Sequence, residues 1–183
     1  MTNYYRKITG ERLYLSPLDP NDETVHTKWA EWMNDRSVAD YFDGFHTMFS
    51  QSSAKKLVEG LQGYRFLIIT ADNDALIGQV SLHNIDHLHR NAFLGILIGE
   101  KDYRNRGYGT EAIRLALEYG FKTLNLHNIM LSVLSDNTAG IACYKKVGFK
   151  EAGCGREWVF KNGKYVDKLY MDLLDNEFTG DGG

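Results

Sequence analysis

The sequence has few cysteines and no long hydrophobic run, and each absence excludes a class of protein. It contains two cysteines, Cys143 and Cys154, whose spacing fits neither a metal site nor a redox pair. We therefore expect buried or half-buried free thiols and a cytoplasmic protein. The apolar runs are far shorter than the roughly 20 residues of a membrane-spanning helix, and residues 1–15 are too charged for a signal peptide. No membrane partner is expected.

A dense basic patch is also lacking. The chain has 21 Lys and Arg against 24 Asp and Glu, a net charge of −3, so nothing favours a nucleic-acid partner. Hydrophobic residues make up 43% of the 183 residues, which is enough to bury one sizeable core. The sequence therefore predicts a single domain over residues 1–178, followed by a flexible tail at residues 179–183.

The most informative segment is residues 104–112, RNRGYGTEA. Gly107 and Gly109 allow a tight turn that brings bare peptide N–H groups against a ligand. A helix is predicted directly afterwards. The unpaired N–H groups and the positive dipole end of its first turn, together with Arg104 and Arg106, favour an anion such as a pyrophosphate. Its apolar face repeats at helical spacing through Ile113, Ala116, Leu117, Gly120, Phe121 and Leu124.

A short apolar run of strand length, residues 92–98, precedes this segment. The succession of strand, Arg-x-x-Gly-x-Gly loop and helix resembles motif A of the GCN5-related N-acetyltransferases (GNAT). The same letters satisfy the looser dinucleotide fingerprint Gly-x-Gly-x-x-Ala. Two features favour the acetyltransferase: a charged connector at residues 99–103, and the lack of an acid at residues 131–133, where the dinucleotide fold needs one about 20 residues after its glycines.

A second motif supports the same resemblance. Residues 136–149, DNTAGIACYKKVGF, resemble the family signature Asn-x-x-Ala-x-x-x-Tyr-x-Lys-x-Gly-Phe, with Gly140 where alanine is usual. Asn137 is a good N-cap for a short helix, and Gly148 suits its C-terminal end. Asn137 and Tyr144 are then about two turns apart on one face of that helix.

The resemblance implies an α/β (α+β) fold with a mixed, mostly antiparallel central sheet. We expect about seven strands and about four helices, with a V-shaped splay between the fourth and fifth strands. The turn signal Asn162-Gly163 predicts a final hairpin. Helices are expected at residues 22–34, after Ser50, after Gly109 and after Asn137, and strands at residues 12–15, 64–70, 75–82, 92–98, 129–134, 157–160 and 165–174.

By the same resemblance, acetyl-CoA is the acetyl donor and no metal is required. Unpaired peptide groups at the splayed strand would hold its pantetheine arm, and one N–H group would polarise the thioester carbonyl. The segment at residues 104–110 would bind the pyrophosphate. The cofactor-binding residues implied are Leu97, Ile98, Gly99, Arg104, Asn105, Arg106, Gly107, Tyr108, Gly109, Thr110, Asn137 and Lys146.

Tyr144 is the candidate general acid, because a phenol with a reference pKa near ~10 can donate a proton to a leaving thiolate. The general base stays open. Phe93 stands where many relatives carry a glutamate. The histidines upstream, at positions 83, 87 and 89, titrate in a useful range, and a water chain ending on Asp43 is an alternative.

The acceptor is predicted to be a primary amine that attacks acetyl-CoA directly in a ternary complex. The chain resembles two branches of the family, which acetylate N-terminal amines of ribosomal proteins (the alanine N-acetyltransferases) or the polyamines spermidine and spermine. Asp43, Phe45 and His83 are the candidate substrate-binding residues, by charge and cation–π contact. The partner is thus a small-molecule or peptide amine, and a homodimer or higher homo-oligomer is left open. A non-catalytic acetyl-CoA sensor and a dinucleotide-binding oxidoreductase are the alternatives.

Overall fold

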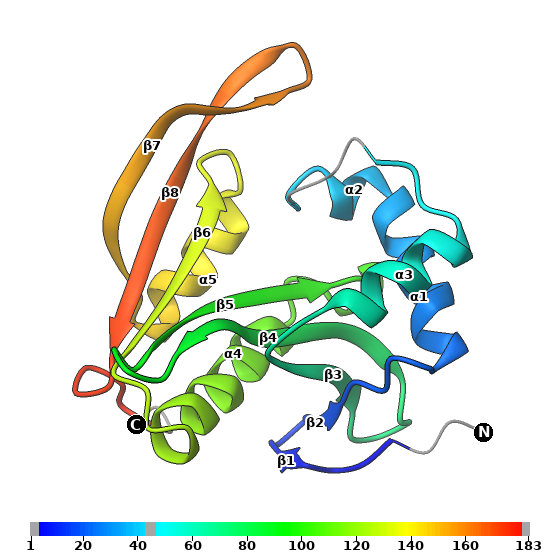
Figure 1. The fold of residues 1–183 in the computed structure, drawn as a ribbon, viewed down its shortest axis with the longest axis horizontal. Coiled ribbons are helices and arrows are strands. Elements are labelled where there is room, and N and C mark those ends of the chain that lie inside the picture. Colours follow the sequence, from blue (N-terminus) through cyan, green and yellow to red (C-terminus); the bar gives the residue numbers. More distant parts are fainter. Residues whose placement is uncertain (1–3, 43–46, 181–183) are drawn as a thin grey trace.

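One sheet of eight strands organises the protein, in the order β1-β2-β3-β4-β5-β6-β8-β7 (Figure 1). The computed structural model describes residues 4–42 and 47–180. All neighbouring strands are antiparallel except β5 and β6, which run parallel. This arrangement excludes the parallel sheet of a dinucleotide-binding fold. The strands are β1 (Ile8–Thr9), β2 (Leu13–Pro17), β3 (Tyr64–Thr70), β4 (Leu76–Asp86), β5 (Asn91–Ile98), β6 (Asn128–Leu134), β7 (Lys150–Lys161) and β8 (Lys164–Leu174).

Two hydrophobic clusters lie on opposite faces of the sheet, because successive strand residues point to opposite sides. On β3, Phe66 and Ile68 pack in one cluster and Leu67 and Ile69 in the other. The first cluster includes α4 (Tyr108–Glu118) and the end of α5 (Thr138–Val147). The second includes α1 (Glu23–Asn34), α2 (Arg36–Ala39) and α3 (Gln51–Gly60). Both faces of the sheet are therefore covered by helices.

The strands β5 and β6 separate along their length. Their pairing is confined to Asn91–Phe93 against Asn128–Met130, where the two strands start. Beyond these residues they diverge, and Figure 1 shows the V that opens between them. The splay between the fourth and fifth predicted strands is confirmed. Within the described residues, the C-terminal half of β5 therefore has no strand neighbour on that side.

The helix boundaries follow the local signals in the sequence. The Ser50 hydroxyl accepts a hydrogen bond from the Ser53 N–H, and the Ser53 hydroxyl accepts from the Ser50 N–H, which caps α3. Asn137 Oδ1 accepts from the Gly140 N–H at 2.9 Å and caps α5. Gly148 ends that helix in the left-handed conformation, with φ at 118°. The three predictions are confirmed.

Several expected boundaries differ from the structure. The short elements β1 and α2 were missed, because two and four residues are too few to show a period; the sheet therefore has eight strands rather than about seven, and the described chain has five α-helices. The helix predicted through Leu124 ends at Glu118 and continues as a π-helical turn, Tyr119–Thr123. Strands β4 and β7 are longer than predicted.

Three further expectations concern the whole chain. Cys143 and Cys154 are free thiols, as predicted; Cys143 is half-buried, but the expected burial is wrong for Cys154, which is exposed. No helix within residues 4–42 and 47–180 combines the length and the apolar character needed to cross a bilayer. The single domain, the tail at residues 179–183 and the location in the cytoplasm stay predictions.

Candidate active site

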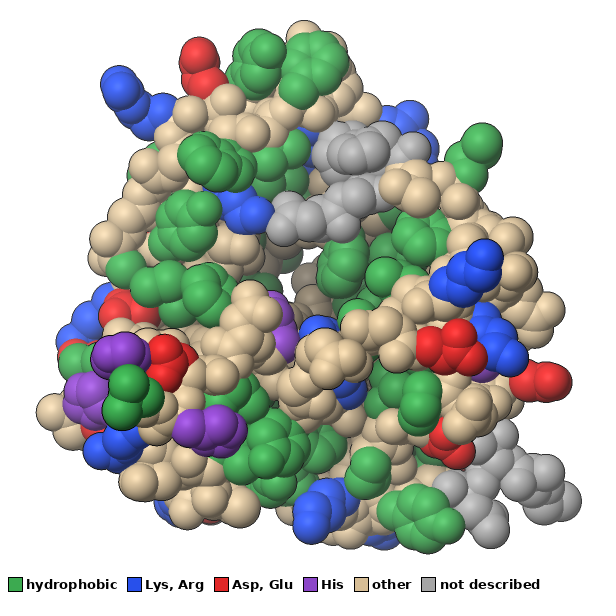
Figure 2. All heavy atoms as spheres, viewed as in Figure 1, with side chains coloured by type: hydrophobic (Ala, Val, Ile, Leu, Met, Phe, Trp, Pro, Cys, Tyr) green, Lys and Arg blue, Asp and Glu red, His purple; other side chains and the backbone are tan. Residues whose placement is uncertain are grey.

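A cavity of about 450 Å³ occupies the splay between β5 and β6. Its walls come from both halves of the molecule: β4, β5 and α2 on one side, and β6, α5 and β8 on the other. Figure 2 shows the hollow between these halves, with histidine and basic atoms visible in it. Of the residues singled out in the sequence, it brings together His83, Leu97, Ile98, Arg104, Asn137 and Tyr144.

Peptide groups along β5 alternate between the β4 side and the cleft side. The Gly99 N–H donates to the Ile77 carbonyl of the neighbouring strand at 2.9 Å, and Leu97 is in register with Gln79. The Ile98 carbonyl faces the other way. The expectation that Leu97, Ile98 and Gly99 all present unpaired peptide groups is therefore wrong for the Gly99 N–H. By this alternation, the peptide groups that face the cleft are those of Ile98 and of the other even-numbered residues in the C-terminal half of β5.

Arg104 binds the protein itself rather than standing free for an anion. Its Nε donates to the Ile98 carbonyl at 3.0 Å and its Nη2 to the Gly99 carbonyl at 2.5 Å. Its Nη1 donates to the hydroxyl of Ser37 at 2.9 Å and to its carbonyl at 3.3 Å. The expected role of Arg104 in charging the pyrophosphate site is corrected to a positioning role, since its guanidinium joins the end of β5 to α2.

The loop before α4 has the backbone of an anion cradle. Gly107 is the N-cap and lies in the left-handed region, with φ at 85°, which favours glycine. No side chain of the described residues caps this helix, so the N–H groups of its first turn, at Tyr108, Gly109 and Thr110, remain for a ligand. Arg106 is exposed beside them.

Arg12, just before β2, holds this loop in place. Its Nη1 donates to the Arg106 carbonyl at 2.8 Å, and its Nε pairs with Glu111 at 3.0 Å. Its guanidinium also lies 4.8 Å from the centre of the Tyr108 ring. The cradle is thus supported from the opposite end of the chain, and no motif within the loop predicted that contact.

Tyr144 projects from α5 into the cavity. Its ring packs against Phe149 with centroids 6.0 Å apart, and its phenol has no hydrogen-bond partner among the described residues. Burial raises the pKa of Tyr144 above its ordinary value near 10, so the phenol is protonated at neutral pH. Asn137 also lines the cavity, with its oxygen used by the helix cap. Lys146 is exposed and does not line the cavity.

His83 differs from the two histidines that follow it. It lies on β4 in the cavity wall, whereas His87 and His89 are exposed in the turn after that strand, and His89 pairs with Asp86 at 2.8 Å. Burial, and then the charge of Arg65, lower the pKa of His83 below its ordinary value. The imidazole is therefore neutral at neutral pH.

The floor of the cavity contains residues that the motif analysis passed over. Arg65, Ser81 and Gly95 lie in register across β3, β4 and β5. Arg65 Nη1 donates to Ser81 Oγ at 3.1 Å. Polar residues at every second position of β4 signalled a polar inner face, namely Gln79, Ser81 and His83. Phe93, which replaces the family glutamate, lines the cavity too, and Asp43 and Phe45 lie outside the described residues.

The hairpin of β7 and β8 reaches α2 across the mouth of the V. Arg36 Nη2 donates to the Asn162 side chain at 2.7 Å. The ammonium of Lys161 lies 4.2 Å from the centre of the Tyr41 ring, and it pairs with Asp136 at 2.8 Å. Since Tyr41 lines the cavity, the contact with Lys161 connects the hairpin to the cavity wall.

The arrangement matches a known family of enzymes. The family model described as "Acetyltransferase (GNAT) domain" matches residues 12–150, well over half of the chain. The chain belongs to this acetyltransferase family. GNAT enzymes use acetyl-CoA, so the predicted acetyl donor and the acyltransferase activity are confirmed.

Relatives of known structure or name agree. The spermidine N-acetyltransferase of Vibrio cholerae, solved in complex with CoA and spermine, is 30% identical with a TM-score of 0.79, over 91% of this chain and 97% of that one. The uncharacterized N-acetyltransferase YnaD of Bacillus subtilis (strain 168) is 28% identical, over 94% of this chain and 99% of YnaD. YdaF of the same organism, named as a candidate ribosomal N-acetyltransferase, is 33% identical over 58% of each chain. Both branches expected from the sequence are thus among this GNAT protein's relatives.

Proposed function

We propose that this protein transfers the acetyl group of acetyl-CoA to a primary amine by direct attack in a ternary complex. The observation that carries the proposal is the cavity that combines the open edge of β5 with the protonated phenol of Tyr144. The thioester must lie between these two features. The first turn of α4 fits the pyrophosphate, because its N–H groups have no side-chain cap.

The chemistry needs one bond made and one broken. The neutral amine attacks the thioester carbonyl carbon, the carbon–sulfur bond breaks, and CoA leaves as a thiolate. Tyr144 gives its proton to the sulfur, and the amine loses a proton to a base in the cavity wall. Proton exchange through solvent then returns the base and the phenol to their starting states. The products are the acetamide and CoA with its thiol. Peptide N–H groups on the cleft side of β5 would stabilise the developing oxyanion.

Direct attack fits the nucleophiles present. No cysteine lines the cavity among the described residues, and Cys143 instead contacts the Thr110 hydroxyl at 3.3 Å between α4 and α5. An acetyl-enzyme intermediate on a thiol is therefore not supported. Steady-state rates measured against both substrates should give intersecting rather than parallel double-reciprocal lines, as a ternary complex requires.

His83 is the proposed proton acceptor for the amine. Its imidazole is neutral because burial and Arg65 depress its pKa, and it lies in the wall of the same cavity. Phe93 beside it, with ring centroids 6.2 Å apart, has no group that accepts a proton. A histidine thus takes the task that a glutamate on β5 performs in many relatives.

An N-terminal α-amine fits this cavity better than a polyamine. Its described lining contains Arg65, Arg104 and Lys168 and no carboxylate. A polyamine would bring several positive charges against these groups. An α-amine has a reference pKa of about 8, so a large fraction is neutral and ready to attack near neutral pH.

A thiol-release assay tests the proposal. Acetyl-CoA is incubated with N-terminal peptides, amino acids and spermidine, and free CoA thiol is measured beside the acetylated product. We expect transfer to an α-amine, and loss of transfer in Tyr144→Phe. A protein that binds CoA tightly while acetylating no amine would be a sensor instead. Acetyl-CoA should also raise the melting temperature, whereas NAD at equal concentration should not.

A further inference from the structure

Arg65 places a positive charge in the floor of the cavity without a matching negative charge. The residue is half-buried at the start of β3. Its Nε donates to the Gln62 carbonyl at 2.8 Å and its Nη1 to Ser81 Oγ at 3.1 Å, and both acceptors are neutral. Among the described residues, no carboxylate forms an ion pair with it, and none lines the cavity.

Such an arrangement is unfavourable for the empty protein. A guanidinium has five N–H donors, and the contacts of Arg65 to the protein use two of its nitrogens. Burial lowers the pKa of Arg65, which means that its charge is incompletely solvated. Buried charges in proteins are normally paired. A ligand anion would supply both the missing charge and the missing acceptors.

A glycine keeps the cavity floor open beside Ser81 and His83. Gly95 lies in register with Ser81 on the next strand, and a Cβ atom at Gly95 would come 3.2 Å from Ser81 Oγ and 3.4 Å from Cε1 of His83. Any larger residue at Gly95 would therefore cover the floor between these side chains. Arg65 and the proposed proton acceptor His83 line this same cavity.

This anion site is separate from the cradle for the pyrophosphate. The cradle lies next to Ile98, since a Cβ atom at Gly109 would come 3.7 Å from the Ile98 side chain. Gly95 lies three residues earlier on β5, and three residues span about 10 Å of strand. The side chain of Arg65 also points to the face of the sheet that carries α1–α3, since it alternates with Phe66, which packs in the cluster of α4. Arg65 thus lies on the face opposite to α4, in the same cavity as the proposed proton acceptor His83.

We propose that Arg65 selects the acceptor, which is an amine that also carries a carboxylate close to the amino group. The fork of the guanidinium matches a carboxylate with two parallel hydrogen bonds. Two sources offer this chemistry: an α-amino acid with a free carboxylate, and a peptide whose first residue is acidic. This inference rests on the proposed acetyl transfer and names its substrate class.

The test compares acceptors that differ by one charge. The first pair is an amino acid and its amide, and the second is a peptide beginning with Asp and its Asn counterpart. The wild-type enzyme should prefer the charged member of at least one pair by tenfold or more in kcat/KM, and the pair that discriminates identifies the source. Arg65→Gln should bring that ratio close to one, and Arg65→Lys should keep part of it, because the charge remains but the fork is lost.

Two measurements separate a role in selection from a role in folding. Arg6→Gln, on the far edge of the sheet, is the matched control and should keep the wild-type ratio. Melting temperatures of all variants establish that each is folded. Arg65→Glu should reverse the preference toward spermidine, a gain that a merely damaged protein would not show.

Binding without turnover distinguishes the two proposals. In the presence of CoA, an N-acetyl amino acid should bind at least tenfold more tightly than its amide, and Arg65→Gln should remove that difference. If no amine is acetylated but this difference in binding is found, the acetyl transfer is wrong and the anion site stands. If wild type and folded Arg65→Gln treat charged and neutral acceptors alike, the inference about Arg65 is wrong.

Discussion

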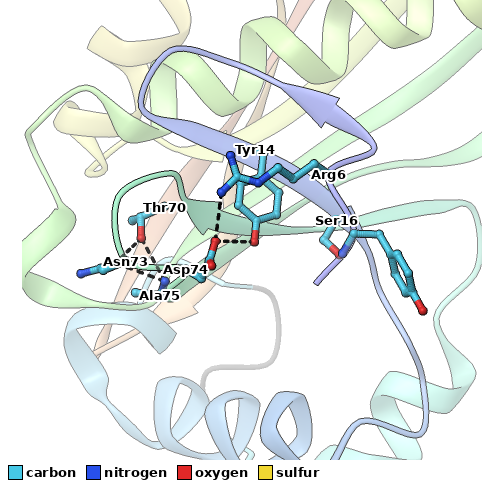
Figure 3. A network of polar contacts seen from close by, with 8 residues as sticks. Arg6, Tyr14, Ser16, Thr70, Asn73, Asp74 and Ala75 are labelled. Atoms are coloured by element: carbon cyan, nitrogen blue, oxygen red, sulfur yellow. Dashed lines mark hydrogen bonds and ion pairs between the residues drawn. The ribbon is translucent and has the colours of Figure 1, made fainter. Parts of the chain in front are cut away.

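Arg6 and Arg65 are two arginines in contrasting environments. Arg6 pairs with Asp74 at 3.3 Å and lies 4.5 Å from the centre of the Tyr14 ring (Figure 3). Tyr14 donates to the same carboxylate at 2.8 Å. Arg65 donates to a carbonyl and a hydroxyl and faces a cavity. The contrast separates a polar network that is complete within the protein from one that lacks a partner.

The network around Arg6 is paired within the protein, and it lies at the turn between β3 and β4. In that turn Thr70 Oγ1 and Asn73 Oδ1 both accept from the Ala75 N–H, at 3.0 and 3.2 Å (Figure 3). Burial, followed by the hydrogen bond to Asp74, raises the pKa of Tyr14 to about 12. The charges and donors of this network stabilise the edge of the sheet, whereas those of the cavity remain for substrates. Changes in the two regions should therefore affect different properties.

The largest effect is expected for Tyr144→Phe. The change keeps the ring packed on Phe149 and removes the proton for the leaving thiolate. General-acid contributions are typically 10²–10⁴-fold, so kcat should fall by at least about 50-fold, with water as a partial substitute. The KM for acetyl-CoA should hardly change, because the interaction is made in the transition state. Near-normal kcat with a lowered melting temperature would make Tyr144 a purely structural tyrosine.

A smaller effect is expected at the cradle. Gly109→Val adds a side chain at the first turn of α4, where a Cβ atom would meet only Ile98 at 3.7 Å and Ile96 at 3.9 Å. The fold should survive, and calorimetric titration should show acetyl-CoA affinity reduced at least tenfold, about 1.4 kcal/mol. Gly153→Val is the control, since a Cβ atom there has no neighbour within 4 Å. Unchanged affinity in Gly109→Val would move the pyrophosphate elsewhere.

The pH profile offers a subtler distinction between the two arginines. If neutral His83 accepts the proton, kcat/KM should fall as the pH drops through a pKa below 6.5, the ordinary value for histidine. Arg65→Gln removes a nearby positive charge, so the pKa of His83 should rise and the acidic limb should move to higher pH. Burial, the larger cause of the lowered pKa, remains in Arg65→Gln and should keep the shift modest.

Arg6→Gln should leave the acidic limb where it is, because Arg6 lies outside the cavity. Replacement of His83 by Gln should abolish the limb and lower the rate. A limb that persists in His83→Gln would assign it to another group and remove His83 as the proton acceptor.

The smallest expected effect is on stability. Tyr14→Phe removes the hydrogen bond to Asp74 and should lower the free energy of unfolding by about 1 kcal/mol. That corresponds to a melting temperature about 2–4 °C lower for a protein of this size. Turnover per folded molecule should stay at the wild-type value. A loss of turnover larger than the loss of folded protein would show that the two regions are coupled.

Much of the fold could be predicted because its signals are local. The caps at Ser50 and Asn137 and the turn at Asn162-Gly163 each depend on a few neighbouring residues. The π-helical turn at Tyr119–Thr123 escaped prediction because its apolar spacing is also that of an α-helix. The tertiary packing decides which helical form the chain takes there.

The site was predicted less completely, because part of it depends on contacts between distant segments. Its motif residues, Gly107 and Tyr144, stood out by spacing along the chain. The contact of Arg12 with the Arg106 carbonyl joins segments far apart in sequence, and no local pattern contains it. No local pattern separates His83, as a candidate base, from the two histidines of the turn. Only the structure shows that His83 lies on β4, whereas the other two follow the end of that strand.

The sequence alone determined the order of the longer elements, the glycine cradle before α4 and the place of Tyr144 on one face of α5. Each of these follows from backbone propensity and side-chain period over a few residues. Only the tertiary structure decided that Arg104 is bound by the carbonyls of β5 and that Arg65 lies in register with Ser81 and Gly95. Strand register and the aim of a long side chain depend on packing between distant segments, and that packing set which charge was left for the substrate.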